Sequence, residues 1–483
     1  MNQNLSSSIQ FGTDGWRGVI GFDFNMANLV QVVVASSQEL NFQYFNKVKT
    51  NKILIGFDRR FMAEYFAKSI IPYINACGLK PILSSECVTT PSCSLYVKEK
   101  NLLGSLIITA SHNPHNWLGL KIKNFRGSSV NESFTKAVEE RIQLQNKLEP
   151  GSLDYEEINI KKFYLDKISS KFDIGFILKK LKEMRIKVFF DSMHGSAANS
   201  IDYLFNDNSS NIIRGIRENN DPYFGGNPPE PLIQYLDLLK DTLKCEAKEG
   251  WKTLGIVFDG DGDRIAVIDE MGRYCSTQAL LPYFINFLGK KNNNLYPVLK
   301  TVSGSDIIAN IAKKQNREVF ELPVGFKYIA ERMINENIFI GGEESGGVGF
   351  GNFLPERDGL FAAMVLLNGI AEQSQYLCES LDEIQNEFGP SFYDRVDICF
   401  QDNNKKNVLK DFILKNIPNK IGDHFIIKVS NIDGIKLRLE NNYWILFRFS
   451  GTEPLLRLYC EAPSKHLLEK SLKWSKEFIN NCN

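Results

Sequence analysis

Three aspartates separated by single glycines form the most strongly acidic motif of the sequence, Asp259-Gly-Asp261-Gly-Asp263, which is followed by Arg264. A spacing of two puts the three carboxylates on one side of an extended or turning backbone, and the glycines let that backbone curl. Carboxylate oxygens suit a hard divalent cation, so the motif predicts a Mg²⁺ site. We reject a calcium-binding EF-hand, because its sixth position needs glycine where this chain has Arg264.

A serine lies just past the apolar run from Gly104 to Ile108, which we expect to be a buried strand. Pro114 keeps the preceding residue out of the helical region, so the chain must turn sharply with Ser111 at the tip. Strict alternation from Leu118 to Lys123 predicts a second strand, whose two lysines flank the serine hydroxyl. Loops at the carboxyl ends of strands are the usual place for chemistry in α/β sheets. Taken alone, the segment is equally typical of a hairpin turn with solvated lysines.

The loop Arg448-Phe-Ser450-Gly451-Thr452 combines a guanidinium, two hydroxyl groups and a glycine. Such a loop can form an anion nest, in which backbone N–H groups and the arginine bind a phosphate.

Near the N-terminus, Phe11-Gly-Thr-Asp-Gly-Trp-Arg-Gly18 holds three glycines around Arg17. A tight turn alone explains those glycines, so Arg17 becomes interesting only if a phosphate lies nearby.

A further polar cluster, Gly341-Gly-Glu-Glu-Ser-Gly-Gly347, offers hydrogen-bond acceptors between paired glycines. We expect it at the end of a strand, where a polyhydroxylated ligand can approach the backbone closely. Glycine-rich loops with acidic residues are common, so this signal is weak by itself. The segment Pro323-Val-Gly-Phe-Lys-Tyr-Ile329, which contains Lys327, is a second polar cluster of this region.

Strand and helix patterns alternate around these motifs, which predicts an α/β fold. We expect a strand at Ile53–Phe57, a helix around Met62–Ile74, and an apolar strand from Leu254 that leads into the acidic motif. After residue 388 the pattern changes to antiparallel strands, one of them at His424–Val429, with helices near 405–416 and 465–480, as in a small α+β domain. We therefore expect four domains: residues 1–160 with the Ser111 loop, 161–276 with the acidic motif, 277–387 with the Glu343 cluster, and 388–483 with the Arg448 loop.

Composition excludes several classes of protein. Lys and Arg together number 57 and so do Asp and Glu, so no net charge favours nucleic acid or an anionic membrane surface. The nine cysteines are scattered and contain no Cys-x-x-Cys pair, which indicates reduced thiols. The N-terminus lacks the pattern of a signal peptide, and the apolar window Leu360–Ile370 is too short to span a bilayer. We expect a cytoplasmic protein with a small-molecule ligand.

Taken together and in this order, five motifs resemble the α-D-phosphohexomutase family: the Phe11–Gly18 segment, Thr109-Ala-Ser-His-Asn-Pro114, Asp259–Arg264, Gly342-Glu-Glu-Ser-Gly346 and Arg448–Thr452. The resemblance covers the whole chain. It implies three similar α/β domains with mixed sheets and a small fourth domain around a central cleft. The Gly-Glu-Glu-Ser-Gly form is more similar to the phosphoglucomutase branch than to the phosphomannomutase or phosphoglucosamine branches. Gly347 stands where those other branches carry a histidine.

The resemblance also implies roles for individual residues. Ser111 carries a phosphoryl group, and its phosphate completes a Mg²⁺ site with Asp259, Asp261 and Asp263. The cationic candidates that stabilise the transferring group are Arg17, His112, Lys121 and Arg264. The residues expected to bind substrate are Lys327, Glu343, Ser345, Arg448, Ser450, Gly451 and Thr452, with Arg457 as a further phosphate contact. We expect neighbouring cations to lower the pKa of Lys121 so that it exchanges a proton with the sugar, and His112 is the competing candidate.

The expected reaction interconverts glucose 1-phosphate and glucose 6-phosphate through a phosphoserine enzyme and glucose 1,6-bisphosphate. Mannose phosphates, or net formation of the bisphosphate, are alternatives within the family. A phosphatase or phosphate sensor, and a non-catalytic sugar-phosphate binding protein, are alternatives outside it. A mutase releases no inorganic phosphate, whereas a phosphatase does. Either a monomer or a dimer is compatible with the sequence.

Overall fold

The computed structural model describes residues 9–144, 148–205, 211–291, 293–400, 403–450 and 455–481. These residues divide into two compact units. The first unit comprises Met1–Thr277, Gly325–Asn337 and Ser345–Leu377, and the second comprises Gln278–Val324, Ile338–Glu344 and Cys378–Asn483.

The first unit begins with a six-stranded mixed sheet in the order β1-β5-β4-β2-β3-β6. Strands β4, β2, β3 and β6 run parallel, whereas β5 is antiparallel to both of its neighbours, β4 and β1. The predicted strand before Ser111 is confirmed as β4, every residue of which is buried. The strands are β1 (Trp16–Val19), β2 (Lys52–Phe57), β3 (Lys80–Ser84), β4 (Gly104–Ile108), β5 (Trp117–Asn124) and β6 (Glu156–Ile158).

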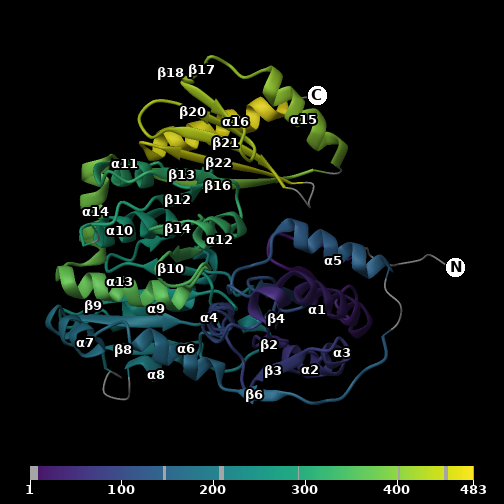
Figure 1. Ribbon diagram of the computed structural model, residues 1–483. Coiled ribbons are helices and arrows are strands. Elements are labelled where there is room, and N and C mark those ends of the chain that lie inside the picture. The colour runs from purple at the N-terminus through teal and green to yellow at the C-terminus, as the bar shows by residue number, and fades with distance from the viewer. Residues whose placement is uncertain are drawn as a thin grey trace. The chain divides into compact units, whose positions relative to one another are not determined.

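Helices cover both faces of this sheet, which explains why its central strands are continuously apolar. One face packs with α1, α2, α3 and α5 into a large core, and the other packs with α4 and α6 (Figure 1). Asn25 caps the first turn of α1 by accepting a hydrogen bond from the N–H of Asn28. The helices are α1 (Met26–Val48), α2 (Ala63–Ser69), α3 (Ile71–Ala76), α4 (Thr90–Lys100), α5 (Glu132–Leu144) and α6 (Ile160–Ser169).

A second mixed sheet of the first unit has the order β11-β10-β9-β7-β8. Strand β9 runs parallel to β7 and antiparallel to β10, so the acidic motif occupies the tight connection between β9 and β10. The strands are β7 (Ile186–Asp191), β8 (Ile213–Ile216), β9 (Lys252–Phe258), β10 (Ile265–Ile268) and β11 (Tyr274–Cys275). The helices between them are α7 (Ile174–Glu183), α8 (Ser200–Phe205) and α9 (Asp237–Glu246), with short 3-10 turns η2 (Phe224–Gly226) and η3 (Ile233–Tyr235).

Three later elements complete the first unit. They are α12 (Phe326–Asn335), β15 (Val348–Phe350) and α13 (Gly359–Gln373). Helix α13 contains the apolar window noted in the sequence and is buried along most of its length. Asp358 caps its first turn by accepting a hydrogen bond from the N–H of Phe361.

The second unit begins with the parallel strands β13, β12 and β14, which lie side by side in that order. The strands are β12 (Val298–Thr301), β13 (Val319–Leu322) and β14 (Ile340–Gly342). The helices of this region are α10 (Thr277–Gly289), α11 (Ile307–Lys314) and α14 (Leu377–Phe388), of which α10 and α14 each begin on the last residue of a first-unit segment.

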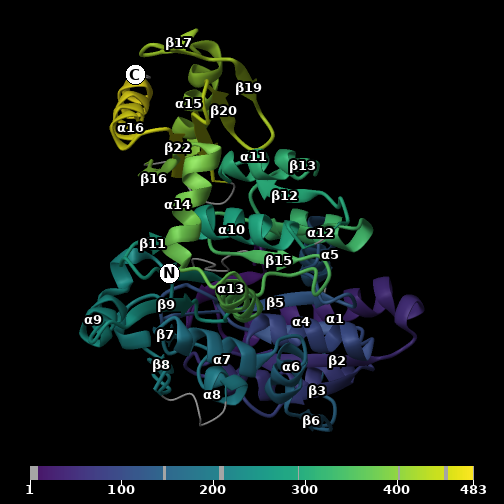
Figure 2. The same cartoon turned by 90° about the vertical axis from the view of Figure 1, so that its left-hand side faces the viewer.

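The C-terminal part of the second unit is a five-stranded antiparallel sheet in the order β16-β22-β21-β20-β19. Helices α15 and α16 pack on one of its faces, as Figure 2 shows. The strands are β16 (Phe392–Cys399), β19 (Lys428–Ser430), β20 (Ile435–Arg438), β21 (Trp444–Phe449) and β22 (Leu455–Ala462). A small ribbon of β17 (Lys420–Ile421) and β18 (His424–Phe425) lies outside the sheet, and the helices are α15 (Asn403–Lys415) and α16 (Lys465–Asn480).

Two elements differ from the sequence prediction. The single helix expected over residues 62–74 is two helices, α2 and α3, because Pro72 lies in the first turn of α3 and cannot continue a preceding helix. The single strand expected over residues 424–429 is divided between β18 and β19. Among the described residues, no helix is both long enough and apolar enough to cross a membrane.

Candidate active site

Ser111 lies on a sharp turn directly after β4. Its φ is +53°, a left-handed conformation that costs a non-glycine residue about 1–3 kcal/mol. The turn is closed by a hydrogen bond from the N–H of Asn113 to the carbonyl oxygen of Ala110. The hydroxyl of Ser111 donates to Asp259 Oδ2 at 2.9 Å and lies 3.2 Å from His112 Nδ1. The turn predicted from the sequence is therefore present, and it brings the serine to the acidic motif.

The acidic motif forms one buried cluster. Carboxylate oxygens of Asp259, Asp261 and Asp263 lie within 4.8 Å of one another. The N–H groups of Asp263 and Arg264 both donate to Asp259 Oδ1, which holds the loop in its curled form. A Cβ on Gly260 would lie 2.4 Å from the carbonyl oxygen of Ser111, so only glycine permits this close approach of the two loops.

The cluster has the properties of a metal site. Burial and the charges of Asp263 and Asp261 raise the pKa of Asp259 well above its usual value. Among the described residues, Asp261 Oδ1 and Asp263 Oδ1 are buried without a hydrogen-bond donor. Buried carboxylate oxygens without a donor are costly, and a divalent cation would satisfy them. The donor set therefore fits Mg²⁺.

Lys121 has surroundings opposite to those expected from the sequence. Its ammonium group lies 2.9 Å from Asp14, 2.7 Å from Asp261 and 2.8 Å from Asp263, and its side chain is 1% exposed. Burial alone would lower the pKa of Lys121, but these three carboxylates raise it above its ordinary value. The predicted lowering by neighbouring cations is thus wrong. The alternative of solvated lysines on this strand is also wrong.

His112 remains beside the serine. Burial lowers the pKa of His112 well below its usual value, and the charges of Arg264, Arg17 and Lys121 lower it further. The imidazole is therefore neutral, with one ring nitrogen available as an acceptor. Both candidates for proton transfer lie in the site, but only Lys121 is bound by carboxylates.

The two predicted arginines of the first unit also lie at this site. Arg17 donates from Nη1 to Asn113 Oδ1 at 2.5 Å, so it contacts the Ser111 turn. Arg264 Nε lies 3.8 Å from Asp259 and 4.0 Å from Asp263. The backbone N–H of Ile265 donates to Gly346, which anchors the Ser345 end of the glycine-rich loop beside the acidic motif.

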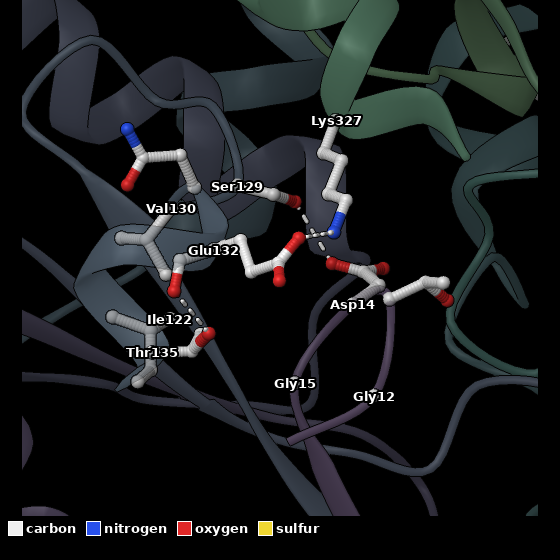
Figure 3. A pocket seen from close by; sticks show the side chains of 11 residues that line it. Gly12, Asp14, Gly15, Ile122, Ser129, Val130, Glu132, Thr135 and Lys327 are labelled. Carbon is white, nitrogen blue, oxygen red and sulfur yellow. Dashed lines mark hydrogen bonds and ion pairs between the residues drawn. The ribbon is translucent and has the colours of Figure 1, made fainter. Parts of the chain in front are cut away.

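Lys327 projects from α12 over a small pocket beside this cluster (Figure 3). Its ammonium group lies 3.8 Å from Glu132 Oε2. The other wall of the pocket is the turn around Asp14, whose carboxylate contacts Lys121 and accepts a hydrogen bond from Ser129. Lys327 thus lines the same pocket as Asp14, and Lys121 connects Asp14 to the acidic cluster.

The remaining predicted residues belong to the second unit. Glu343 and Glu344 follow β14, and Glu344 Oε2 accepts hydrogen bonds from Ser303 at 2.6 Å and Thr301 at 3.4 Å. These hydroxyls hold Glu344 at the carboxyl end of β12. Glu343 is buried, at 4% exposure.

Arg448 lies on β21 and donates from Nε to Asp433 Oδ2 at 2.8 Å. Burial opposes the charge of Arg448, but Asp433, Tyr459 and Glu344 raise its pKa above the ordinary value. The carbonyl oxygen of Ser450 accepts a hydrogen bond from Lys406.

Three further residues were predicted to contact a phosphate, namely Gly451, Thr452 and Arg457. Gly451 and Thr452 lie outside the described residues. Arg457 is on β22, and its Nε lies 3.9 Å from Asp397.

Sequence reasoning missed Arg357 and Glu356, which bind charged residues around the acidic motif. Arg357 donates to both Asp14, at 2.6 Å, and Asp263, at 2.8 Å. Glu356 binds Lys123 at 2.5 Å, on the same face of β5 as Lys121. The run Glu356-Arg357-Asp358 before an apolar helix was the available signal, because adjacent charges before a buried element need partners.

Comparison with known proteins agrees with this geometry. Four family models match, described as phosphoglucomutase/phosphomannomutase alpha/beta/alpha domain I over residues 8–149, domain II over 162–272, domain III over 278–388, and the C-terminal domain over 405–472. The chain belongs to the α-D-phosphohexomutase family. The predicted four-domain α/β architecture with mixed sheets is therefore confirmed, and this phosphohexomutase is an enzyme of the mutase class.

Relatives of this phosphohexomutase carry several substrate names. A phosphoglucosamine mutase of Methanocaldococcus jannaschii is 29% identical over 89% of this chain and 93% of its own length. A phosphoglucomutase/phosphomannomutase of Thermococcus kodakarensis is 25% identical over 97% and 99%. A crystal structure from Thermus thermophilus, assigned as a phosphomannomutase, has a TM-score of 0.84 at 27% identity and covers 99% of this chain and 100% of that one.

Proposed function

We propose that this phosphohexomutase interconverts glucose 1-phosphate and glucose 6-phosphate by lending a phosphoryl group from Ser111. The observation that carries the proposal is the contact between the Ser111 hydroxyl and Asp259, 2.9 Å apart, at the edge of a buried three-carboxylate cluster. A serine with a purely structural role would need neither a strained backbone nor a cluster of like charges beside it. The arrangement therefore supports a chemical role for Ser111.

The proposed reaction cycle consists of two phosphoryl transfers, from Ser111 to the sugar and back. The bond between phosphorus and Ser111 Oγ breaks while a bond to the free sugar hydroxyl forms, and the hydroxyl proton passes to an acceptor in the site. His112, neutral and beside Ser111 Oγ, is our candidate acceptor. The sugar bisphosphate then turns, and its other phosphoryl group returns to Ser111. A Mg²⁺ ion held by Asp259, Asp261 and Asp263 would supply charge neutralisation at the phosphoryl oxygens.

Positive groups balance the negative charge that gathers on the transferring phosphoryl. In the first unit, Arg17 and Arg264 lie at the Ser111 turn and at the acidic loop. Lys121 and Arg357 are bound by carboxylates, so they offset the charge of the cluster itself. Arg17 and Arg264 pair less closely with carboxylates than Lys121 and Arg357 do. We therefore assign Arg17 and Arg264 to the transferring phosphoryl group.

In the second unit, we assign Arg448, Ser450, Gly451 and Thr452 to the phosphate that does not react. Glu343 and Ser345 are assigned to sugar hydroxyls, with Lys327 as a further contact. The hydrogen bonds from Ser303 and Thr301 fix Glu344, which supports the choice of Glu343 as the acid that binds sugar.

Glucose is our choice of sugar because the loop Gly342-Glu-Glu-Ser-Gly346 ends without a histidine at Gly347. The relatives named for glucosamine and mannose phosphates make those sugars the direct competitors. Initial rates on glucose, mannose and glucosamine 1-phosphates, measured side by side, decide between them. A value of kcat/KM for either competitor above that for glucose would overturn this choice.

The phosphoryl-transfer step has its own test. Protein labelled with ³²P on serine should pass the label to a hexose phosphate, and Ser111→Ala should abolish turnover while substrate affinity changes little. Inorganic phosphate should not accumulate. Its release at the rate of substrate loss would indicate a phosphatase, and ligand binding with no conversion would indicate a binding protein.

A further inference from the structure

Arg60 is a fully buried arginine next to the Ser111 turn. It follows β2, whose parallel neighbour β4 leads into Ser111. The side chain is 0% exposed and so cannot reach a ligand in solution. Its guanidinium stacks on the ring of Phe224, 4.9 Å from the ring centroid.

The guanidinium of Arg60 donates to the backbone of the Ser111 turn at four places. Nη2 donates to the carbonyl oxygens of Ser111 at 2.6 Å and Asn113 at 2.7 Å. Nη1 donates to those of Pro114 at 2.8 Å and Trp117 at 3.2 Å. The backbone from residue 111 to residue 117 thus curls around one planar cation, whose fork geometry a lysine cannot reproduce.

A second chain of contacts connects Arg60 to the amide side of Ser111. Arg60 Nε lies 3.2 Å from Asp58 Oδ2. The same carboxylate oxygen accepts a hydrogen bond from the hydroxyl of Thr109 at 2.6 Å, and that hydroxyl accepts one from the N–H of Ser111 at 2.9 Å. Both the N–H and the carbonyl oxygen of Ser111 are therefore fixed by groups that lead back to Arg60.

We propose that Arg60 is a positioning residue, which holds the turn of residues 111–117 in the strained form that brings the Ser111 hydroxyl to the acidic loop. The proposal rests on the proposed role of Ser111 in phosphoryl transfer. It also gives a function to the loop of residues 224–229, because Phe224 covers the guanidinium and the carbonyl oxygen of Pro229 accepts a hydrogen bond from the N–H of Gly260.

Arg317 in the second unit provides a matched control. It is 5% exposed, donates to the carbonyl oxygens of Asn294 and Tyr296, and stacks on Phe339 at 3.9 Å. Replacing either arginine by lysine removes a buried fork from loop carbonyls. Only Arg60→Lys removes it from the turn that carries the nucleophile.

The experiment compares wild type, Arg60→Lys and Arg317→Lys at a temperature at which all three are folded. We expect Arg60→Lys to lower kcat by about 100-fold, because small displacements of a reacting group cost rate, while KM changes less than about threefold. Hydrogen–deuterium exchange of residues 109–117 should be about tenfold faster than in wild type, since this segment loses local stability. Arg317→Lys should change neither quantity.

Several outcomes would overturn the proposal: a kcat within about threefold of wild type for Arg60→Lys, equal losses in both variants, or unchanged exchange in residues 109–117. If Arg60→Lys does not fold, Asp58→Asn provides the second variant. It keeps the four carbonyl contacts but removes the charge that orients the guanidinium, and kcat should fall by about tenfold. A wild-type protein inactive on every hexose phosphate would refute the proposed function instead, and exchange in residues 109–117 would still decide the role of Arg60.

Discussion

At the scale of single residues, two lysines on one face of β5 have different partners. Lys121 is bound by Asp14, Asp261 and Asp263, which belong to the acidic cluster and its neighbour. Lys123, two residues later, is bound by Glu356 at 2.5 Å and Ser129 at 2.7 Å. Both side chains are almost fully buried. We therefore assign the first lysine to the proposed reacting site and the second mainly to stabilising the fold.

Replacement of each lysine by methionine tests this difference. Removing one partner of a buried ion pair leaves the other charge unpaired, which costs about 3–5 kcal/mol of the free energy of unfolding. We expect that loss for both Lys121→Met and Lys123→Met in urea unfolding. At 25 °C, with both variants folded, only Lys121→Met should also lower kcat, by about 100-fold or more. An equal loss of kcat in Lys123→Met would show that both lysines act in the site.

The sequence identified the residues whose roles depend on local order. Strand prediction and spacing located Ser111 and the three aspartates at the ends of strands. The resemblance to the phosphohexomutase family, and not the local pattern, predicted that they meet in one site. The pKa of Lys121 was wrongly predicted, because the carboxylates that raise it are more than 100 positions away along the chain. The importance of Arg60 could not be predicted for a different reason: its acceptors are backbone carbonyls, which no residue type reveals.

At the scale of elements, the N-terminus of α13 combines a cap with a buried acid. Asp358 Oδ1 accepts a hydrogen bond from the hydroxyl of Tyr164 and one from the N–H of Phe361. Its other oxygen, Oδ2, is buried without a donor among the described residues. Burial raises the pKa of Asp358 to about 7, although its two hydrogen bonds oppose that change. A proton on Oδ2 relieves the cost of this burial.

The resulting pH dependence has a definite sign. The pKa of Asp358 is about 7 when folded and about 3.9 when unfolded, so the folded form binds the proton more tightly. Its contribution to stability is fully present below pH 4 and is lost as the pH rises to 7, by an amount on the order of 4 kcal/mol. Asparagine keeps the cap but cannot titrate. The difference in unfolding free energy between wild type and Asp358→Asn should therefore change over this range in favour of the variant, and a constant difference would contradict the assignment.

Elements also explain where the fold could be predicted. The buried strands β2, β4 and β9 are short apolar runs bounded by polar turns, and their positions agree with the sequence. The helix over residues 62–74 was wrongly predicted as continuous, because the periodicity of its apolar residues outweighed Pro72. Local pattern therefore located the elements better than it located their ends.

At the scale of the whole molecule, all residues of the proposed metal site lie in the first unit. The second unit contains Arg448, which we propose to bind phosphate, but none of the three aspartates. A ligand that binds only the folded form of one unit stabilises that unit by mass action. The two units should therefore respond differently to Mg²⁺.

Thermal unfolding checks this expectation, with tryptophans as separate reporters. Trp16, Trp117 and Trp251 belong to the first unit, and Trp444 and Trp474 to the second. At 100 times its Kd, Mg²⁺ should raise the Tm of the first unit by about 5 °C and leave that of the second unchanged. Chelator should abolish activity, and Mg²⁺ should restore it. Full activity in chelator would contradict the metal site, and equal shifts of both transitions would show that the units unfold together.

The positive φ of Ser111 has a consequence for which alcohol can occupy this position. Threonine has the same hydroxyl, but a branched Cβ is strongly disfavoured at φ +53°. A Ser111→Thr exchange, which is conservative in chemistry, would therefore move the backbone rather than simply add a methyl group. The main-chain torsion at residue 111 therefore favours serine over threonine, whatever the relative reactivity of their hydroxyl groups.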